Sequence, residues 1–540
     1  MIVINLIILS CSNDPDDFII NFVPDNTIVV DEPELPTIEN SAFLEINDFI
    51  WENLNQYYYW QADVPDLSDA KESNQTTYIE LLNSKDNPKD FFESLKYKDD
   101  RFSSINEDYK ELENQLQGIS ASNGLEFQLT YACSTCDEIV GYVTYIQPNS
   151  NASEQDIKRG DFFDGVNNTT LTASNYVDLL FSNKLKYTLN MAEVDNETIV
   201  SSNKTVQLTK IENFQENPIQ TSKIISIQDK KIGYLMYTRF LGSYDEELIQ
   251  VFSDFSNNNI TDLIIDLRYN PGGQVNTCIY LASMITGQFV GEVFSKEIWN
   301  SKMDELIKQE YPQRLQNLFT DKTNSEDNPI TLPGLNMSKV YFITSQSTAS
   351  ASELLINGLK PYIDVIQIGD VTLGKNVGSI TLYDYIDNNS LTKNPNHNYA
   401  MQPIVLKIAN SEGNADFVNG LLPDKSIKED HFDLILESVG LEITRHQAIN
   451  SIAPGGTIVH IGLTQPSGTF NFKKLTIQEV TLVGTYCYTN DDFKNSLVIL
   501  KDKKLGDLGW IDYRDLKKGS DAFQEIHNGT CVAPKIILIP

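Results

Sequence analysis

Apolar residues recur at two different periods along the first 430 residues of this 540-residue chain. From about residue 41 to 118 they return every three or four positions, as at Phe43, Ile46, Ile50 and Leu54, which predicts amphipathic helices. Further along, short apolar runs rich in β-branched residues alternate with helical stretches, which predicts buried strands. These runs lie at 231–240, 263–267, 340–345 and 365–370. The alternation predicts a mixed α/β core with functional residues on turns after strands.

Two residues in the segment 348–379 form a candidate catalytic pair. Lys375 follows Ser350 by 25 positions. A serine hydroxyl is a poor nucleophile at neutral pH, so a nearby base has to remove its proton. Of the five histidines only His397 precedes residue 431, which leaves few candidates for the usual base. A lysine can take that role where burial keeps its amine neutral, so the spacing indicates a Ser-Lys dyad.

A glycine turn follows the apolar run at 263–265. The turn is Asn270-Pro271-Gly272-Gly273, whose residue types allow positive φ and a close approach of the backbone. Such a turn can direct N–H groups at the negative oxygen that develops during acyl transfer. Residues 353–359 read as a helix, so Ser350 is expected near a helix N-terminus, where the dipole favours negative charge.

The run Ala349-Ser350-Ala351-Ser352-Glu353, with Gly374-Lys375 after it, resembles the catalytic signature of the carboxy-terminal processing (tail-specific) serine peptidases. That resemblance implies a nucleophilic Ser350, a basic Lys375 and no metal or other cofactor. It also implies an oxyanion hole made by Gly272 or Gly273 together with Ala351. Relatives often carry a glutamine four residues after the lysine. This chain has Ser379 there, a candidate for orienting the amine.

Residues 119–215 resemble the PDZ domain of the same family. The loop Gly124-Leu125-Glu126-Phe127 is similar to a PDZ carboxylate-binding loop, and residues 172–183 are expected to form the following helix. The resemblance implies that an extended peptide adds as a strand to the domain edge, with its terminal carboxylate held by loop N–H groups. The implied partner is a polypeptide with a free C-terminus. The stretch 99–112 resembles the family segment before this domain, and we expect it to be structural.

Charge separates the last 110 residues from the rest. The chain has 41 Lys and Arg against 75 Asp and Glu, a net charge of −34, which argues against nucleic acid or an anionic membrane surface as a partner. Residues 431–540 hold 11 basic and 12 acidic residues, so the charge is concentrated in the first 430. The terminal segment resembles the C-terminal half of a zinc-type medium-chain alcohol dehydrogenase. It lacks a G-x-G-x-x-G and zinc ligands, so the half that would carry the chemistry is missing. Because the peptidase resemblance stops at about residue 430 and this one starts within a domain, we interpret the segment as a gene fusion or an assembly chimera.

The opening MIVINLIILSC resembles a bacterial lipoprotein signal, which implies that Cys11 carries the lipid and that membrane contact is through this anchor alone. We therefore expect a location in the bacterial cell envelope, periplasmic or surface-exposed. Cys133 and Cys136 form a lone C-x-x-C, which favours a local disulfide or inert packing over zinc or redox catalysis. The expected domains are a signal and disordered tether, a helical region, a PDZ-like domain, a catalytic core and a partial Rossmann-like segment, at 1–39, 40–118, 119–215, 216–430 and 431–540.

Three functions remain open on the sequence. The favoured one is a serine endopeptidase that cleaves proteins or peptides with unstructured C-terminal tails docked by the PDZ-like domain. The first alternative is a catalytically inactive PDZ scaffold that binds peptides, because the usual orienting glutamine is replaced by Ser379. The second alternative, an NAD-dependent oxidoreductase, is supported by the terminal segment alone.

Overall fold

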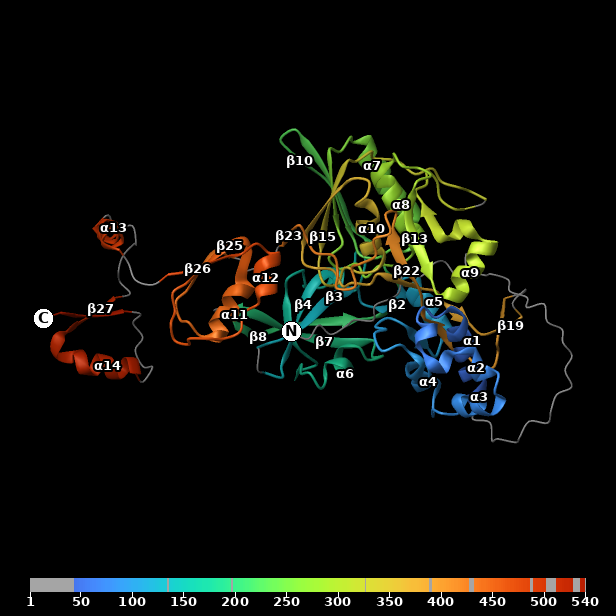
Figure 1. The fold of residues 1–540 in the computed structure, drawn as a ribbon, viewed down its shortest axis with the longest axis horizontal. Helices are drawn as coiled ribbons and strands as arrows, with labels where there is room; N and C mark the ends of the chain where they lie inside the picture. Colours follow the sequence, from blue (N-terminus) through green and yellow to red (C-terminus); the bar gives the residue numbers. More distant parts are fainter. Residues whose placement is uncertain are drawn as a thin grey trace. The chain divides into compact units, whose positions relative to one another are not determined.

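The computed structural model divides the chain into two compact units, residues 1–428 and 429–540, which are described separately (Figure 1). It describes residues 43–133, 136–195, 198–325, 327–387, 391–426, 432–485, 489–501, 511–527 and 535–539. Cys11 and the expected signal and tether lie outside these residues. In the ranges just given, no helix is both long and apolar enough to cross a bilayer.

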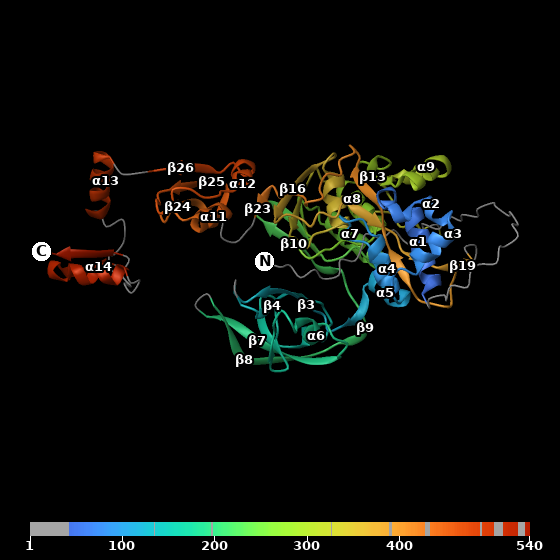
Figure 2. The same ribbon diagram turned by 60° about the horizontal axis from the view of Figure 1, so that its bottom comes forward.

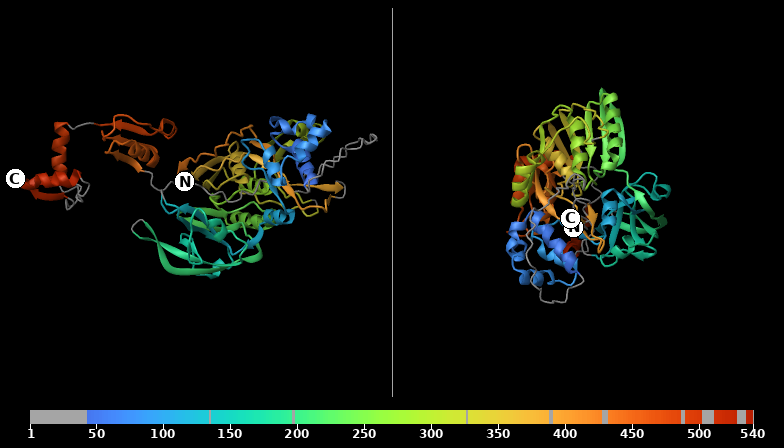
Figure 3. Two further views of the ribbon diagram at one scale, coloured as in Figure 1. Left: turned by 90° about the horizontal axis from the view of Figure 1, so that it is seen from below. Right: turned by 90° about the vertical axis from the view of Figure 1, so that its right-hand side faces the viewer.

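The first unit begins with a group of helices, blue in Figure 3, as the spacing of apolar residues predicted. Asn74 and Asn87 cap two of them, because each side-chain oxygen accepts an N–H from the first helical turn. Their apolar faces pack around Ile50, Trp51 and Phe91, which are almost wholly buried. The predicted helical region is therefore confirmed. The helices are α1 Leu44–Tyr57, α2 Asp69–Glu72, α3 Gln75–Leu82, α4 Pro88–Leu95 and α5 Tyr109–Leu116.

A six-stranded sheet forms the centre of this unit, in the order β10-β11-β12-β15-β16-β23. All neighbouring strands are parallel except β10, which pairs antiparallel with β11 at one edge. The strands are β10 Ile219–Ile227, β11 Lys230–Tyr237, β12 Asp262–Asp266, β15 Lys339–Thr344, β16 Asp364–Gly369 and β23 Lys425–Ser426. The mixed α/β core predicted from the alternating runs is confirmed. Because parallel strands end at the same edge, the turns after β11, β12, β15 and β16 meet there.

Helices cover the central sheet, and a second sheet packs against one of them, α10 (Figure 1). The helices of this part are α7 Asp245–Asn257, α8 Val275–Thr286 and α10 Ala351–Leu359, together with α9 Ser301–Glu310, which packs against the second sheet. The second sheet has the order β14-β13-β22-β17, with β13 Val293–Trp299, β14 Gln316–Leu318, β17 Val377–Ser379 and β22 Ile404–Asn410. Every residue of α10 is buried, so this helix is a rigid support for the turn that precedes it. Small strands complete this part: β1 Ser104–Asn106, β18 Leu382–Tyr383, β19 Tyr385–Asp387, β20 Thr392–Lys393 and β21 Ala400–Gln402.

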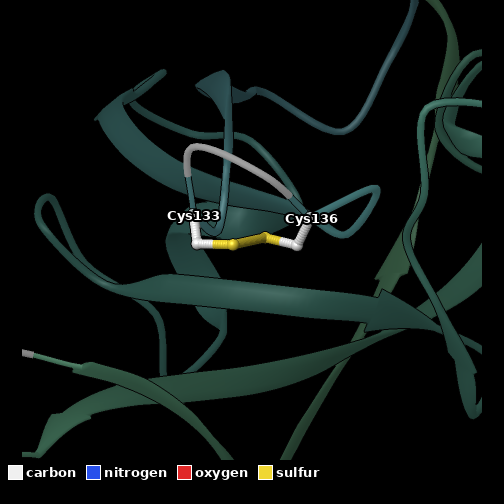
Figure 4. The surroundings of a disulfide bond; sticks show 2 residues. All are labelled: Cys133 and Cys136. Atoms are coloured by element: carbon white, nitrogen blue, oxygen red, sulfur yellow. A yellow bond between two sulfur atoms is a disulfide. The ribbon is translucent and has the colours of Figure 1, made fainter.

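A separate antiparallel sheet lies between the helical region and the core in sequence (Figure 2). Its strands are β3 Leu125–Tyr131, β4 Ile139–Ile146, β5 Phe162–Val166, β6 Thr169–Thr170, β7 Lys186–Asp195 and β8 Thr198–Thr209. Strands β2 Ile119–Ser122 and β9 Ile211–Gln215 pair antiparallel where the chain enters and leaves this sheet. On the hairpin between β3 and β4, Cys133 and Cys136 form a disulfide (Figure 4).

The helix predicted over residues 172–183 is shorter than expected. The structure has α6 at Tyr176–Leu180. The Asn175 side chain accepts the N–H of Thr172 at 2.8 Å, which closes a turn ahead of the helix. Local bonds from a side chain to the backbone compete with helical hydrogen bonds, so the first part of the predicted helix is a turn.

The second unit contains a small parallel sheet in the order β24-β25-β26. Its strands are β24 Phe432–Glu437, β25 Ile452–His460 and β26 Thr481–Gly484, with α11 Glu442–Ser451 and α12 Phe472–Ile477 between them in sequence. Its apolar cluster is small, centred on Ile449, Ile452 and Ile458. The remaining elements are α13 Asn490–Lys501, β27 Ile511–Asp515, α14 Gly519–His527 and β28 Lys535–Ile539, with β27 and β28 parallel.

Candidate active site

Three turns of the first unit meet at the carboxyl edge of the central sheet. They follow β12, β15 and β16 and contain the glycine turn, Ser350 and Lys375 respectively. The Ala349 N–H donates to the Asn270 carbonyl at 3.0 Å, which joins the first two turns. The Leu373 N–H donates to the Thr348 carbonyl at 2.9 Å, which joins the second and third. The structure thus brings together the glycine turn, Ser350 and Lys375, which were predicted from the sequence to form one site.

Ser350 occupies a strained position at the start of α10. It is the N-cap residue, is 2% exposed, and has φ 60° and ψ −117°. These angles match the first central position of a type II′ turn, which normally favours glycine. A non-glycine residue keeps such a conformation only where its surroundings hold it there. One restraint is the Ser350 N–H, which donates to Glu353 Oε2 at 2.9 Å.

The glycine turn packs directly against Ser350. Gly272 has φ +108°, and a Cβ placed on it would lie 2.7 Å from Ser350 Cβ and 2.9 Å from the Ala351 nitrogen. No side chain fits at that position, which explains the glycine. The Gly272 N–H donates to Asn270 Oδ1 at 2.8 Å, so it is already engaged.

Gly273 has a different orientation from Gly272. It forms a parallel bridge with Phe240, whose N–H donates to the Gly272 carbonyl and whose carbonyl accepts the Gln274 N–H, both at 2.9 Å. In a bridge of this type the central residue directs its own N–H away from the bridge partner. The Gly273 N–H takes part in neither of these two bonds, and the expected role of either glycine beside Ala351 stays a prediction.

Lys375 lies on the turn after β16 and is 2% exposed. Its backbone N–H donates to Glu353 Oε2 at 2.8 Å, and its Nζ lies 5.2 Å from the centre of the Phe102 ring. Arg101 Nη2 donates to the Gly374 carbonyl at 2.9 Å. The stretch 99–112, expected to be structural, thus contacts the lysine turn, a role that sequence reasoning missed.

Ser379 is buried in β17, where it pairs with Ile404 of β22. Its expected role in orienting the lysine amine stays a prediction. In the described part of the chain, no group of three or more His, Cys, Asp or Glu side chains could hold a metal ion.

The predicted peptide-binding residues lie at the start of β3, which is an edge strand of its sheet as described. Gly124 has φ +77°, and Ser150 fills the space where its Cβ would be. Leu125 and Phe127 pack into the apolar cluster of this sheet. Because side chains alternate along a strand, Glu126 and Gln128 lie on the face of β3 that points away from this apolar cluster. Gln128 Nε2 donates to Ser347 Oγ at 3.1 Å, so β3 contacts the turn that carries Ser350.

Glu126 belongs to a cluster of ionisable groups that the sequence did not reveal. Burial raises the pKa of Glu126 to about 8, with the Glu216 carboxylate acting in the same direction and Arg239 opposing it. Arg239 lies 3.4 Å from Glu216 and directly precedes Phe240, the bridge partner of the glycine turn. Glu216 and Arg239 lie 90 and 113 positions after Glu126, so no local pattern could have predicted the cluster.

Three family descriptions match separate parts of the chain. Residues 45–104 match the peptidase S41 N-terminal domain, residues 231–402 match peptidase family S41, and residues 407–502 match the zinc-binding dehydrogenase family. The last match begins before residue 431, where that resemblance was expected to start. In the structure, β22 at 404–410 pairs with β13 and β17 of the first unit. The first residues of the dehydrogenase match, 407–428, therefore belong to the first unit.

Individual relatives also match either a peptidase or a dehydrogenase. The carboxy-terminal processing protease CtpA of Bacillus subtilis is 22% identical over 298 residues, which are 54% of this chain and 56% of that protein. The D-xylulose reductase of Saccharomyces cerevisiae is 28% identical over 102 residues, 19% of this chain and 29% of the reductase. The chain thus spans less than two thirds of either relative.

A solved structure supports the fold. A putative S41 protease from Bacteroides fragilis superposes with a TM-score of 0.54 at 21% identity, covering 74% of this chain and 92% of that one. At this identity the likeness concerns the fold alone. The predicted resemblance is therefore confirmed: residues 45–104 and 231–402 match the peptidase S41 N-terminal domain and peptidase family S41, the first unit has a mixed α/β fold like that of the solved structure, and a match to the zinc-binding dehydrogenase family follows at 407–502.

Proposed function

We propose that this protein is a serine endopeptidase in which Lys375 activates Ser350. The observation that carries the proposal is the convergence of the two residues on Glu353. The Ser350 and Lys375 backbone N–H groups donate to the same oxygen, Oε2, so their nitrogens are no further apart than two hydrogen bonds placed end to end. Both residues are 2% exposed, and excluding water strengthens the polar interactions within the site.

The reaction follows from these positions. An ammonium ion is costly to bury, so burial favours the neutral amine that a general base requires. The amine takes the hydroxyl proton as Ser350 Oγ attacks the substrate carbonyl, and later supplies a proton to the leaving amine. The acyl-enzyme is then hydrolysed by water. Gly273 and Ala351 would donate N–H groups to the oxyanion, and no metal or cofactor enters the mechanism.

The substrates we propose are polypeptides with unstructured C-terminal tails. The β3–β8 sheet would be a PDZ-like domain, in which the tail adds as a strand beside β3 and the Gly124–Phe127 loop holds its carboxylate. In this structure the Gly124 and Leu125 N–H groups donate to Ser122 Oγ and Asn123 Oδ1, so they would have to exchange these partners for the carboxylate. Two observations support this docking: β3 is the last strand in its sheet among the described residues, and Gln128 contacts Ser347 near the nucleophile. Anchoring of the protein in the cell envelope through Cys11 remains part of the proposal.

For residues 431–540 we propose a partial Rossmann-like segment fused to the peptidase. The parallel pairing of β24, β25 and β26, with α11 between the first two strands in sequence, supports this. No chemistry is proposed for it.

A serine-reactive fluorophosphonate tests the proposed nucleophile. The full-length protein should become labelled, and mass spectrometry of its peptides should find the adduct on Ser350, because an activated serine is far more reactive than an ordinary hydroxyl. Labelling should be competed by a peptide substrate. A protein that binds tailed peptides yet takes no label after long incubation would instead be a peptide-binding scaffold.

Replacing Gly272 by alanine should lower kcat/KM by about 10²- to 10³-fold, comparable to the loss of an oxyanion-hole donor. The new methyl group would press on Ser350 Cβ and the Ala351 nitrogen, and so displace both groups. Gly291→Ala is the matched control, since Gly291 has φ +87° with no atom within 4 Å of the added Cβ. Melting temperatures should fall in both variants because both gain the strain of a positive φ, and further in Gly272→Ala because of the added clash. Steady-state kinetics should show lost activity in Gly272→Ala alone. Equal activity of the two variants would contradict the assigned geometry.

A further inference from the structure

We propose that Glu353 is a positioning residue that holds the serine turn and the lysine turn in register for proton transfer. This inference rests on the proposed peptidase function. Glu353 had no role in the sequence reasoning beyond its place in the signature.

The carboxylate of Glu353 accepts four hydrogen bonds. Oε2 accepts the N–H groups of Ser350 and Lys375 at 2.9 and 2.8 Å. Oε1 accepts the Gly374 N–H at 2.7 Å and the Thr372 hydroxyl at 2.5 Å. The side chain is fully buried, so no water competes for these donors. One side chain therefore connects both reacting residues.

A helix cap alone does not explain this arrangement. Glu353 is the third residue of α10, and a glutamate there commonly accepts the N–H of the N-cap residue, here Ser350. That accounts for one of the four bonds. The other three donors come from residues 372–375, on the turn after a different strand. The carboxylate thus joins two turns that could otherwise shift relative to each other.

The chemistry of the donors requires a carboxylate. All four groups present hydrogens, and an ionised carboxylate has acceptor sites on both oxygens. An amide of the same shape has one acceptor oxygen, and its NH₂ group would face two of the donors. Burial raises the pKa of Glu353, while its hydrogen bonds act in the opposite direction. A fold that keeps a costly buried acid at this point, beside a strained Ser350 backbone, is consistent with a functional constraint.

The test is Glu353→Gln in the full-length protein, with Glu437→Gln as control. Glu437 is also a buried carboxylate at a turn and accepts the N–H groups of Val439 and Gly440 and the Thr444 hydroxyl, but it lies in the second unit. We expect Glu353→Gln to lower kcat by about 10²-fold, the effect of misplacing reacting groups by roughly 1 Å. KM should be almost unchanged, because tail docking does not involve this residue. The rate of fluorophosphonate labelling should fall in parallel, and Glu437→Gln should match the wild type.

A second pair of variants keeps the inference testable if Glu353→Gln fails to fold. Thr372→Val removes one donor to the carboxylate, and Thr372→Ser keeps it. We expect the valine variant to lose several-fold in kcat relative to the serine variant, at similar KM. Wild-type kcat in Glu353→Gln, or a loss confined to KM or to melting temperature, would overturn the positioning role. None of these results would affect the proposed function, which is tested separately by fluorophosphonate labelling and by the Ser350 and Lys375 variants.

Discussion

Replacing Ser350 by alanine should abolish cleavage of tailed polypeptides, with kcat reduced by roughly 10⁴- to 10⁶-fold, the range seen when an activated nucleophile is removed. Alanine retains the Cβ that packs against Gly272 and suffers the same backbone strain as serine at φ 60°. The fold should therefore survive, and the loss can be assigned to the missing hydroxyl. Cleavage of a protein with an unstructured C-terminal tail, followed by electrophoresis and steady-state kinetics, measures it.

Ser253→Ala serves as the control for this experiment. Ser253 lies in α7 of the same unit, where its hydroxyl donates to the Ile249 carbonyl, away from the three turns. This variant should cleave at the wild-type rate. Cleavage by Ser350→Ala within tenfold of wild type would exclude Ser350 as the nucleophile and with it the proposed mechanism.

Replacing Lys375 by methionine should reduce kcat by roughly 10³- to 10⁴-fold, because Ser350 would lose its base while the oxyanion donors remain. Methionine has a similar length and suits a buried site, and the backbone N–H of residue 375 can still donate to Glu353. Binding of a tailed peptide, measured by fluorescence anisotropy, should be unchanged. Lys375→Arg should be equally inactive, since a guanidinium cannot act as a base at accessible pH.

Lys308→Met is the control for the lysine variant. Lys308 lies on α9, is largely exposed and pairs with Asp304 four residues before it. Its loss should leave kcat unchanged. If Lys375→Met retained wild-type kcat, another group would have to activate the serine, and the Ser-Lys assignment would be wrong.

Local patterns predicted much of the architecture. The three- and four-residue spacing near Phe43 and Ile50 indicated helices, and the apolar runs at 263–267 and 340–345 indicated buried strands, because each pattern reflects burial of one element. Turn chemistry was equally informative at Asn270–Gly273, where positive φ requires glycine. The sequence pattern was less informative at 172–183, where the side chain of Asn175 closes a turn and the predicted helix is shorter.

Contacts between distant segments could not be predicted in the same way. Phe102 lies beside Lys375 although 273 positions separate them, and Arg239, just after β11, neighbours Glu216 and Glu126 from earlier segments of the chain. Glu353 is part of the run 349–353 that resembles the catalytic signature. Its importance depends on the meeting of the turns after β15 and β16, which follows from strand order rather than from sequence.

Activation of the Ser350 hydroxyl by the Lys375 amine is the step on which the proposed function depends. The most direct measurement is the rate of fluorophosphonate labelling at neutral pH in wild-type protein and in Lys375→Met, with the modified residue identified by peptide mass spectrometry. We expect rapid labelling of Ser350 in the wild type and labelling slowed by at least about 10³-fold in the variant. Equal rates in the two proteins, or an adduct on a serine other than Ser350, would contradict the proposed activation.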